Sequence, residues 1–150
     1  MGASAEIQKA LIAQLRAASA LTAQLAAHPY VSGQKAVLDY VPQAADGAGT
    51  AAFPYVVVGE TTEAEWDTDS TIGRESTVTI HAWSRYRGFS QVKAIMDAVK
   101  AALHDASFAV SGETMVLCFF EFADVVRDPT DPEGLVQHGV QRFRLITQGS

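Results

Sequence analysis

Apolar residues recur every three or four positions in two stretches of the chain, which is the spacing of one helix face. The first stretch, Ala5 to Ala27, places Leu11 and Leu15 on one stripe, and Pro29 disfavours continuation of that helix. The second stretch runs from about Ser90 to Asp105. We expect its buried face to consist of Phe89, Val92, Ile95, Met96, Val99 and Leu103.

Four further segments have the pattern of β-strands. The first is Tyr55 to Glu60, where four consecutive apolar residues suggest a strand covered on both faces. From Arg74 to Arg85 the residues alternate, so one face carries Val78, Ile80 and Ala82 and the other carries Thr77, Thr79, His81 and Trp83. Met115 to Val126 is apolar at its centre. In Leu135 to Thr147 neither face is cleanly apolar, and we expect a bulge near Gly139 to change the alternation.

These segments predict an α+β protein with the order α–β–β–α–β–β. We expect a mainly antiparallel four-stranded sheet with two helices on one face, in a single domain over residues 1–150. A short extended piece, Ala36 to Val41, precedes the strands and ends at Pro42. Polar, Gly-rich or Pro-rich composition predicts flexible loops at about 43–52, 61–73 and 127–134.

Composition and charge remove several classes of function. The net charge of −6 argues against binding driven by neutralisation of nucleic-acid phosphates. No apolar run is long enough for a membrane span, and the N-terminus lacks the pattern of a signal peptide. The single cysteine, Cys118, has no partner for an internal disulfide, so we expect a cytosolic protein with this thiol in the core.

Candidate catalytic and metal-binding groups are few, and we predict no catalytic residue, metal or cofactor. Asp67 and Asp69 have the spacing of part of a calcium loop but lack its remaining ligands, so we interpret residues 60–69 as an acidic loop that is solvated or docks on a partner. The acidic residues of the 127–134 loop, Asp128, Asp131 and Glu133, are interpreted as turn residues. His81 and His138 can approach each other across strands, but no third ligand is apparent.

The remaining polar features suggest protein interfaces. Arg142 and Arg144 project to one side of the last strand and, with Arg85 and Arg87, form the most basic feature of the chain. An aromatic residue among polar ones, such as Trp83, suits an interface core. The predicted interface residues are Trp66, Asp67, Asp69, Trp83, Arg85, Arg142 and Arg144. If copies of the chain assemble into a ring, these arginines can pair with the acidic loop of a neighbouring copy or face a lumen through which DNA passes. We expect the pairing with the acidic loop.

An ordered set of segments resembles the tail terminator, or tail-completion, proteins of long-tailed phages and of gene transfer agents. The segments are Asp39–Pro42, Phe53–Glu60, Trp66–Thr68, Glu75–Arg85, Gly88–Ser90, Ile95–Met96, Ala102–His104, Asp128–Gly134 and His138–Arg144. The resemblance implies a non-enzymatic subunit of a ring, commonly a hexamer, that caps the tail tube, stops its polymerisation and joins tail to head.

The resemblance also implies the partners and the location. The expected partners are other copies of the chain, the tail tube protein and the head–tail connector protein, with DNA passing through the lumen without sequence-specific binding and no membrane involved. We expect assembly in the bacterial cytoplasm and a final place at the head-proximal end of the tail. Two alternatives stay open: another connector subunit, such as an adaptor or stopper, and a small cytosolic enzyme or ligand-binding domain with a deep polar pocket.

Overall fold

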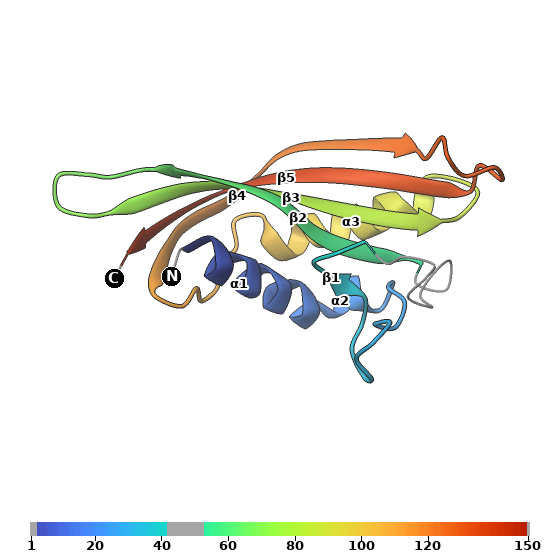
Figure 1. Cartoon of the computed structure of the whole chain (residues 1–150), viewed down its shortest axis with the longest axis horizontal. Helices are drawn as coiled ribbons and strands as arrows, with labels where there is room; N and C mark the ends of the chain where they lie inside the picture. The colour runs from blue at the N-terminus through green and yellow to red at the C-terminus, as the bar shows by residue number, and fades with distance from the viewer. Residues whose placement is uncertain (1–2, 42–52, 150) are drawn as a thin grey trace.

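The protein is a twisted five-stranded sheet with its helices against one face (Figure 1). The structure is a computed structural model, and it describes residues 3–41 and 53–149. The helices are α1 (Ala3–Ala17), α2 (Ser19–Thr22) and α3 (Ser90–Leu103). The strands are β1 (Val37–Leu38), β2 (Tyr55–Glu65), β3 (Gly73–Arg85), β4 (Glu113–Arg127) and β5 (Val136–Gly149). The expected loop at 43–52 lies outside the described residues.

The strand order is β1-β2-β3-β5-β4, and the sheet is mixed. Strand β1 pairs in parallel with β2 through Val37 opposite Val56 and Leu38 opposite Val57, whereas the other three pairings are antiparallel. The expectation of four antiparallel strands is therefore only roughly met. The short extended piece near residues 36–41 contributes the additional strand, because two of its residues find a parallel partner that no local pattern reveals.

The prediction of one helix over residues 5–27 is wrong in extent. Ala18 adopts an extended conformation with φ −82° and ψ 98°, which separates α1 from the single turn of α2. The change of direction lets Leu21 and Leu25 reach the core, where they are at most 4% exposed. Counting α2, the described chain contains three helices, and none of them is long and apolar enough to cross a membrane.

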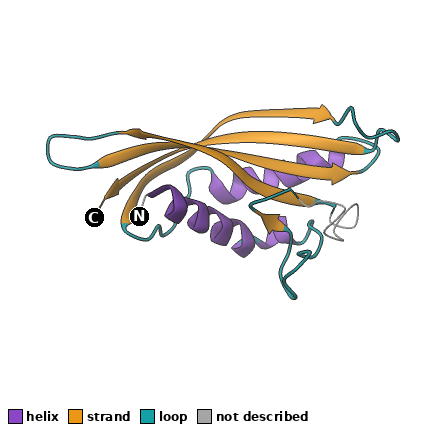
Figure 2. Ribbon diagram, in the orientation of Figure 1, coloured by secondary structure: helices purple, strands orange, loops and turns teal. Residues whose placement is uncertain are grey.

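The core lies between the helices and the face of the sheet that they cover (Figure 2). Ile7, Leu11 and Leu15 of α1 are at most 1% exposed, as are Val78, Ile80 and Ala82 of β3, as predicted. Burial of each of the leucine, isoleucine and valine side chains contributes about 1.5–3 kcal/mol of favourable transfer free energy. Cys118 is fully buried in the same core, and burial raises its thiol pKa to about 12, so it is a core thiol as expected.

Strand β5 is regular at Gly139, so the prediction of a bulge there is wrong. Its pairing with β3 is continuous from Val136 to Gln148, and the register shifts lie in β2 and β4. A Cβ at Gly139 would lie 2.4 Å from the Met96 sulfur, so this glycine lets α3 approach the sheet. The flanking residues Gln137 and Gln141 are buried on the helix side and donate to the carbonyls of Tyr86 and Met96, which explains the mixed alternation.

The predicted loop at 61–73 is largely a β-hairpin. Thr61 to Glu65 continue β2 and pair with β3 from Val78 to Arg74, leaving 66–72 as the connection. In Figure 1 the hairpin extends beyond the ends of the helices. Its outer residues are exposed on both faces, so they lack the apolar alternation by which a strand is recognised in a sequence.

The predicted loop at 127–134 is confirmed in position, between the end of β4 and the start of β5. The carboxylate of Asp131 accepts the backbone N–H groups of Glu133, Leu135 and Val136. Burial would raise the pKa of this carboxyl, but these N–H donors, together with Arg85, lower it below its usual value. The acidic residues of this segment therefore organise a turn, as interpreted from the sequence.

Candidate functional site

The sheet face opposite α1 and α3, here called the open face, carries most of the predicted interface residues. Because side chains alternate along a strand, the neighbours of the buried Val78, Ile80 and Ala82 project to this side. The open face is lined by Glu75, Thr77, Thr79, His81, Trp83 and Arg85 of β3, by His138, Val140, Arg142 and Arg144 of β5, and by Phe119, Phe122, Asp124 and Val126 of β4. Phe122 and Val126 are both 45% exposed, which is high for large apolar side chains.

The three predicted arginines lie on the open face with different partners. Arg144 forms an ion pair with Glu75, and its guanidinium carbon lies 5.2 Å from the ring centre of Trp66. Arg142 is exposed, with its guanidinium carbon 5.4 Å from the Phe122 ring centre. Arg85 lies opposite Val136, eight residues from Arg144 along β5, so about 26 Å separates these positions.

Arg85 is neutralised by the turn that follows β4. Its guanidinium lies 3.3 Å from a carboxylate oxygen of Glu133 and 3.9 Å from one of Asp131. Together with the Arg144–Glu75 pair, this leaves Arg142 as the predicted interface arginine without an ion pair in the described part of the chain. The structure therefore does not gather the arginines into one cluster.

A row of rings crosses the centre of the open face. The rings of Trp83 and His138 stack at 3.8 Å between centroids with 6° between their planes, and Nδ1 of His81 lies 2.8 Å from Nε2 of His138. Nε2 of His81 lies 3.1 Å from a carboxylate oxygen of Glu60, so we assign its proton to that nitrogen and the other N–H to His138. The two histidines therefore meet as the alternation allowed, as a hydrogen-bonded pair.

Burial and the neighbouring His81 lower the pKa of His138, and Asp128 and Glu60 oppose this shift in part. Beside the row, Ala36, Leu38, Tyr55 and Val57 form a small second apolar cluster, against which Trp83 packs. Trp83 is therefore partly enclosed and is rigidly held rather than fully presented to solvent. The sequence pattern identified its face correctly but not these neighbours.

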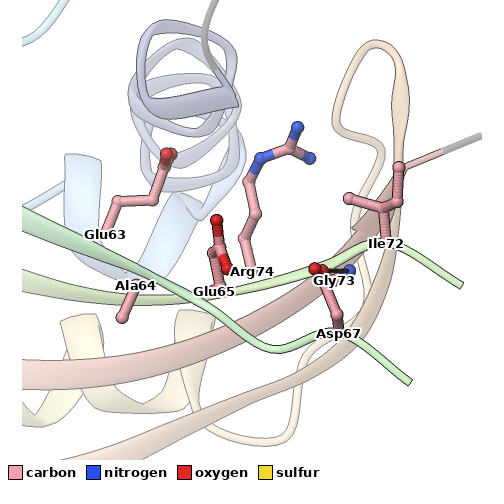
Figure 3. A pocket seen from close by; sticks show the side chains of 7 residues that line it. All are labelled: Glu63, Ala64, Glu65, Asp67, Ile72, Gly73 and Arg74. Carbon is pink, nitrogen blue, oxygen red and sulfur yellow. Dashed lines mark hydrogen bonds between the residues drawn. The ribbon is translucent and has the colours of Figure 1, made fainter. Parts of the chain in front are cut away.

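The hairpin presents an acidic surface on the helix side of the sheet, beyond the helices (Figure 3). Glu63, Glu65 and Arg74 project to the same side and line a hollow of about 310 Å³ together with Asp67. Arg74 is engaged by Glu113 at 2.6 Å, which leaves the surface acidic. Asp67 accepts the N–H of Gly73, whereas Asp69 is exposed in the connection.

Gly73 is required at this turn because a Cβ there would lie 2.3 Å from the carbonyl oxygen of Trp66. Within the described residues, no group of three or more His, Cys, Asp or Glu side chains is arranged to hold a metal ion. The hollow has carboxylates from neighbouring positions of one strand but no convergent set of donors around a point. Its chemistry suits contact with a basic protein surface.

One surface was missed in the sequence. Phe89 was predicted to face the core, but it is 36% exposed, and Lys93 and Arg127 lie over its ring at 5.9 and 5.3 Å from the centre. Phe89 precedes the first residue of α3, so it lies outside the helical periodicity that assigns the other residues to the buried face. The available signal was Arg87, a cation that follows Tyr86 directly and precedes Phe89 by two residues in the sequence.

Comparison with known proteins identifies relatives along almost the whole chain. The model of the family described as "Tail completion protein gp17" matches residues 9–148. The tail completion protein gp17 of Bacillus phage SPP1 is 30% identical over 95 residues, which are 62% of this chain and 66% of that protein. A chain in the structure "Virion of native gene transfer agent (GTA) particle" has a TM-score of 0.79 at 26% identity, covering 99% of this chain and 98% of that one.

These matches agree with the resemblance inferred from the ordered segments, which is confirmed. They also remove the alternative of a small enzyme, because the family is one of structural phage proteins. The chain belongs to the tail completion protein gp17 family.

Proposed function

We propose that this protein is a ring-forming subunit that caps the tail tube of a long-tailed phage-like particle, ends its polymerisation and provides the surface that joins tail to head. The observation that carries the proposal is the fold match to a chain of a gene transfer agent virion over 99% of this chain, together with the family match over residues 9–148. A structural role in head–tail joining follows from these matches, and the tube-capping step is the finer part of the proposal.

The partners follow from this role. The ring consists of copies of this chain, six in the form that the family resemblance implies, and lies between the tail tube protein and the head–tail connector. DNA passes through its lumen without sequence-specific contacts, in keeping with a net charge of −6. We place assembly in the bacterial cytoplasm and the finished ring at the head-proximal end of the tail.

The open face and the hairpin supply the contact surfaces. Trp83 is a fixed aromatic residue with polar neighbours, and Arg142 is an exposed cation beside the exposed Phe122 ring. Arg144 and Arg85 are held by acidic partners of their own chain, so their role is to orient Trp66 and the turn after β4. With Asp67 and Asp69 at the hairpin, these residues form the proposed interface.

Deletion of the coding sequence in the source particle tests the function. Loss of a tube terminator leaves tubes that continue to polymerise, so we expect over-long tails, or tails without heads, in electron micrographs. An adaptor or stopper, which is the alternative, acts on the head side, and its loss would leave tails of normal length that fail to join heads. Normal particles after deletion would reject both roles.

Arg142→Glu tests the open face separately. We expect the variant to fold but to assemble poorly into particles, because the change places a carboxylate at an exposed cation on the contact surface. Lys100→Glu is the matched control, since Lys100 is an exposed cation of α3 that also lies over a phenylalanine ring, that of Phe120, and the change in charge is equal. Arg144 is less suitable because a glutamate there would face Glu75 and disturb the fold. Equal particle yields for both variants would remove the open face from the proposal.

A further inference from the structure

The outer end of the hairpin, here called the acidic tip, combines uncompensated carboxylates with exposed apolar side chains. Glu63, Glu65 and Asp69 are exposed and form no ion pair in the described part of the chain. Trp66 is 45% exposed and Ile72 is 65% exposed in the same connection. An apolar centre with charged neighbours is the composition of a protein contact surface.

A second surface, here called the cationic end, has the complementary composition. Arg87, Lys93 and Arg127 are exposed and have no ion pair among the described residues. Lys93 and Arg127 lie over Phe89, and Tyr86 beside them is 47% exposed. The nearby acids Asp131 and Glu133 are engaged by Arg85. Asp128 accepts hydrogen bonds from Thr130 and keeps its charge, but it forms no ion pair with the three cations among the described residues.

The two surfaces lie at opposite ends of the molecule. In Figure 1 the β2–β3 connection is at one end of the longest axis, and the end of β3, the start of α3 and the end of β4 are at the other. Strand β3 alone, from Gly73 to Arg85, spans about 40 Å between them. The acidic tip therefore cannot reach the cationic end of its own chain, although a second copy can supply it.

We propose that the acidic tip of one copy docks on the cationic end of the next copy, head to tail. Ile72 and Trp66 pack against Tyr86 and Phe89, and the carboxylates of the tip face the three cations. A contact between two different patches of one chain repeats in one direction and closes into a ring when its rotation permits. The inference rests on the proposed function in one respect, namely that the assembly is built from copies of this chain.

The structure favours the cationic end over the open-face arginines as the receptor for the tip. Arg144 is already paired with Glu75, and Arg142 alone would leave the tip carboxylates mostly unmatched. The cationic end offers three unpaired positive charges, which equal in number the three unpaired carboxylates of the tip. Charge matching of this kind fixes the orientation of the contact and opposes the repulsion expected between copies with a net charge of −6.

Exchange of the charges tests the contact. Glu65→Lys/Asp69→Lys places two lysines in the tip, where they face the three cations of the next copy, and Lys93→Glu/Arg127→Glu places two carboxylates at the cationic end, where they face the tip; all four positions are exposed. We expect each variant alone to self-associate at least about tenfold more weakly than the parent in sedimentation at several concentrations. An equimolar mixture of the two, or both pairs of changes in one chain, should restore the association. Failure of both restored combinations would overturn the proposal.

Covalent capture tests the geometry without altering charge. Ser70→Cys lies in the tip and Ser90→Cys at the cationic end, both positions are exposed, and the natural Cys118 is buried. A short bis-maleimide should join the double variant into dimers, trimers and higher species, whereas each single variant should give no ladder. Ser4→Cys/Ser107→Cys, also exposed, is the matched control. Absence of the ladder in solution and in particles, or an equal ladder in the control, would contradict the contact.

The outcomes separate this inference from the proposed function. A ladder and a restored mixture, combined with normal tails after deletion, would support the contact and reject tube capping. Over-long tails after deletion, combined with no ladder in particles, would support tube capping and reject the contact. Defective particles from the Glu65→Lys/Asp69→Lys variant with unchanged self-association would overturn the contact by assigning the tip to a different protein.

Discussion

At Gly139 the side chains of α3 lie directly against the backbone of the sheet. A Cβ at this residue would lie 2.4 Å from the sulfur of Met96 and 3.2 Å from a methyl group of Val92, and both of these side chains belong to α3. A glycine within a strand often marks such an approach of a neighbouring element. The sequence pattern indicated something unusual at this residue but assigned it to a bulge, because alternation along one strand contains no information on what packs above it.

Gly139→Ala should destabilise the protein by about 1–3 kcal/mol, since the methyl group must displace Met96 in a packed core. Urea unfolding of the variant and the parent measures the difference. Gly88→Ala is the control, because a Cβ at Gly88 has no atom within 4 Å, and its effect should stay within about 1 kcal/mol. Equal midpoints for the two variants would show that Met96 yields without cost.

His138 makes stability depend on pH. Its pKa in the folded protein is lowered by burial and by His81, below the ordinary value of 6.5. His138 therefore binds a proton more readily in the unfolded chain than in the folded protein. The free energy of unfolding is then highest above pH 6.5 and decreases as the pH falls through 6.5 toward the lowered pKa of the folded protein.

His138→Gln should consequently lose less stability than the parent between pH 7.5 and pH 5.5 when urea midpoints are compared. A residual decrease is expected from His28, whose pKa is lowered by burial and by Arg16. Identical pH dependence in the parent and the variant would disprove the assignment to His138.

At the scale of elements, extension beyond the core explains why the hairpin was interpreted as a loop. Thr61 to Glu65 form strand through backbone pairing with β3, and their side chains remain mostly in solvent. Secondary structure of this kind is stabilised by a partner strand rather than by an apolar face. The alternation of Arg74 to Arg85 was recognised because that strand crosses the core along most of its length.

Strand β4, at the edge of the sheet, is held at its start by Glu113. This side chain is only 7% exposed and its carboxylate accepts from Arg74 of β3 at 2.6 Å and from the Thr147 hydroxyl of β5 at 3.0 Å. One acidic residue thereby joins three strands. Its loss would leave a buried hydroxyl and a half-buried guanidinium without their acceptor.

Glu113→Ala should therefore lower the free energy of unfolding by about 1–3 kcal/mol, with Arg74's partial exposure reducing the cost expected for a fully buried pair. Glu121→Ala is the matched change at an exposed position of the same strand and should stay within about 0.5 kcal/mol. Chemical denaturation of both variants provides the comparison. A larger loss for Glu121→Ala would contradict the role given to Glu113.

At the scale of the whole molecule, one cluster of buried residues includes side chains from every helix and strand. Leu11 of α1, Leu21 of α2 and Val99 of α3 belong to it together with residues of all five strands. The charged surfaces, in contrast, lie outside this cluster at the two ends. The division lets contacts between copies vary without disturbing the core.

We therefore expect the isolated subunit to unfold in one cooperative transition, as a single domain does. In Trp66→Phe protein, fluorescence then reports on Trp83 in the sheet, and its urea transition should coincide with that of far-UV circular dichroism. Separate transitions would indicate that part of the sheet unfolds independently of the helices.

The sequence by itself determined the central elements, the buried face of β3 and the family. Periodicity is a local property, so the stripes of α1 and α3 and the alternation of Val78, Ile80 and Ala82 were visible without a structure. The ordered segments from the first helix to Phe143-Arg144 were sufficient to recognise a tail completion protein.

Only the tertiary structure decided which charges already have partners. Glu75 meets Arg144 across 69 residues of sequence, and Glu133 meets Arg85 across 48, so neither pair can be read from spacing. The same applies to β1 beside β2 and to Phe89 beneath Arg127, because both depend on which strands lie side by side. Pairing across a sheet is set by the packing of the whole chain, and it leaves unpaired charges gathered at the acidic tip and at the cationic end.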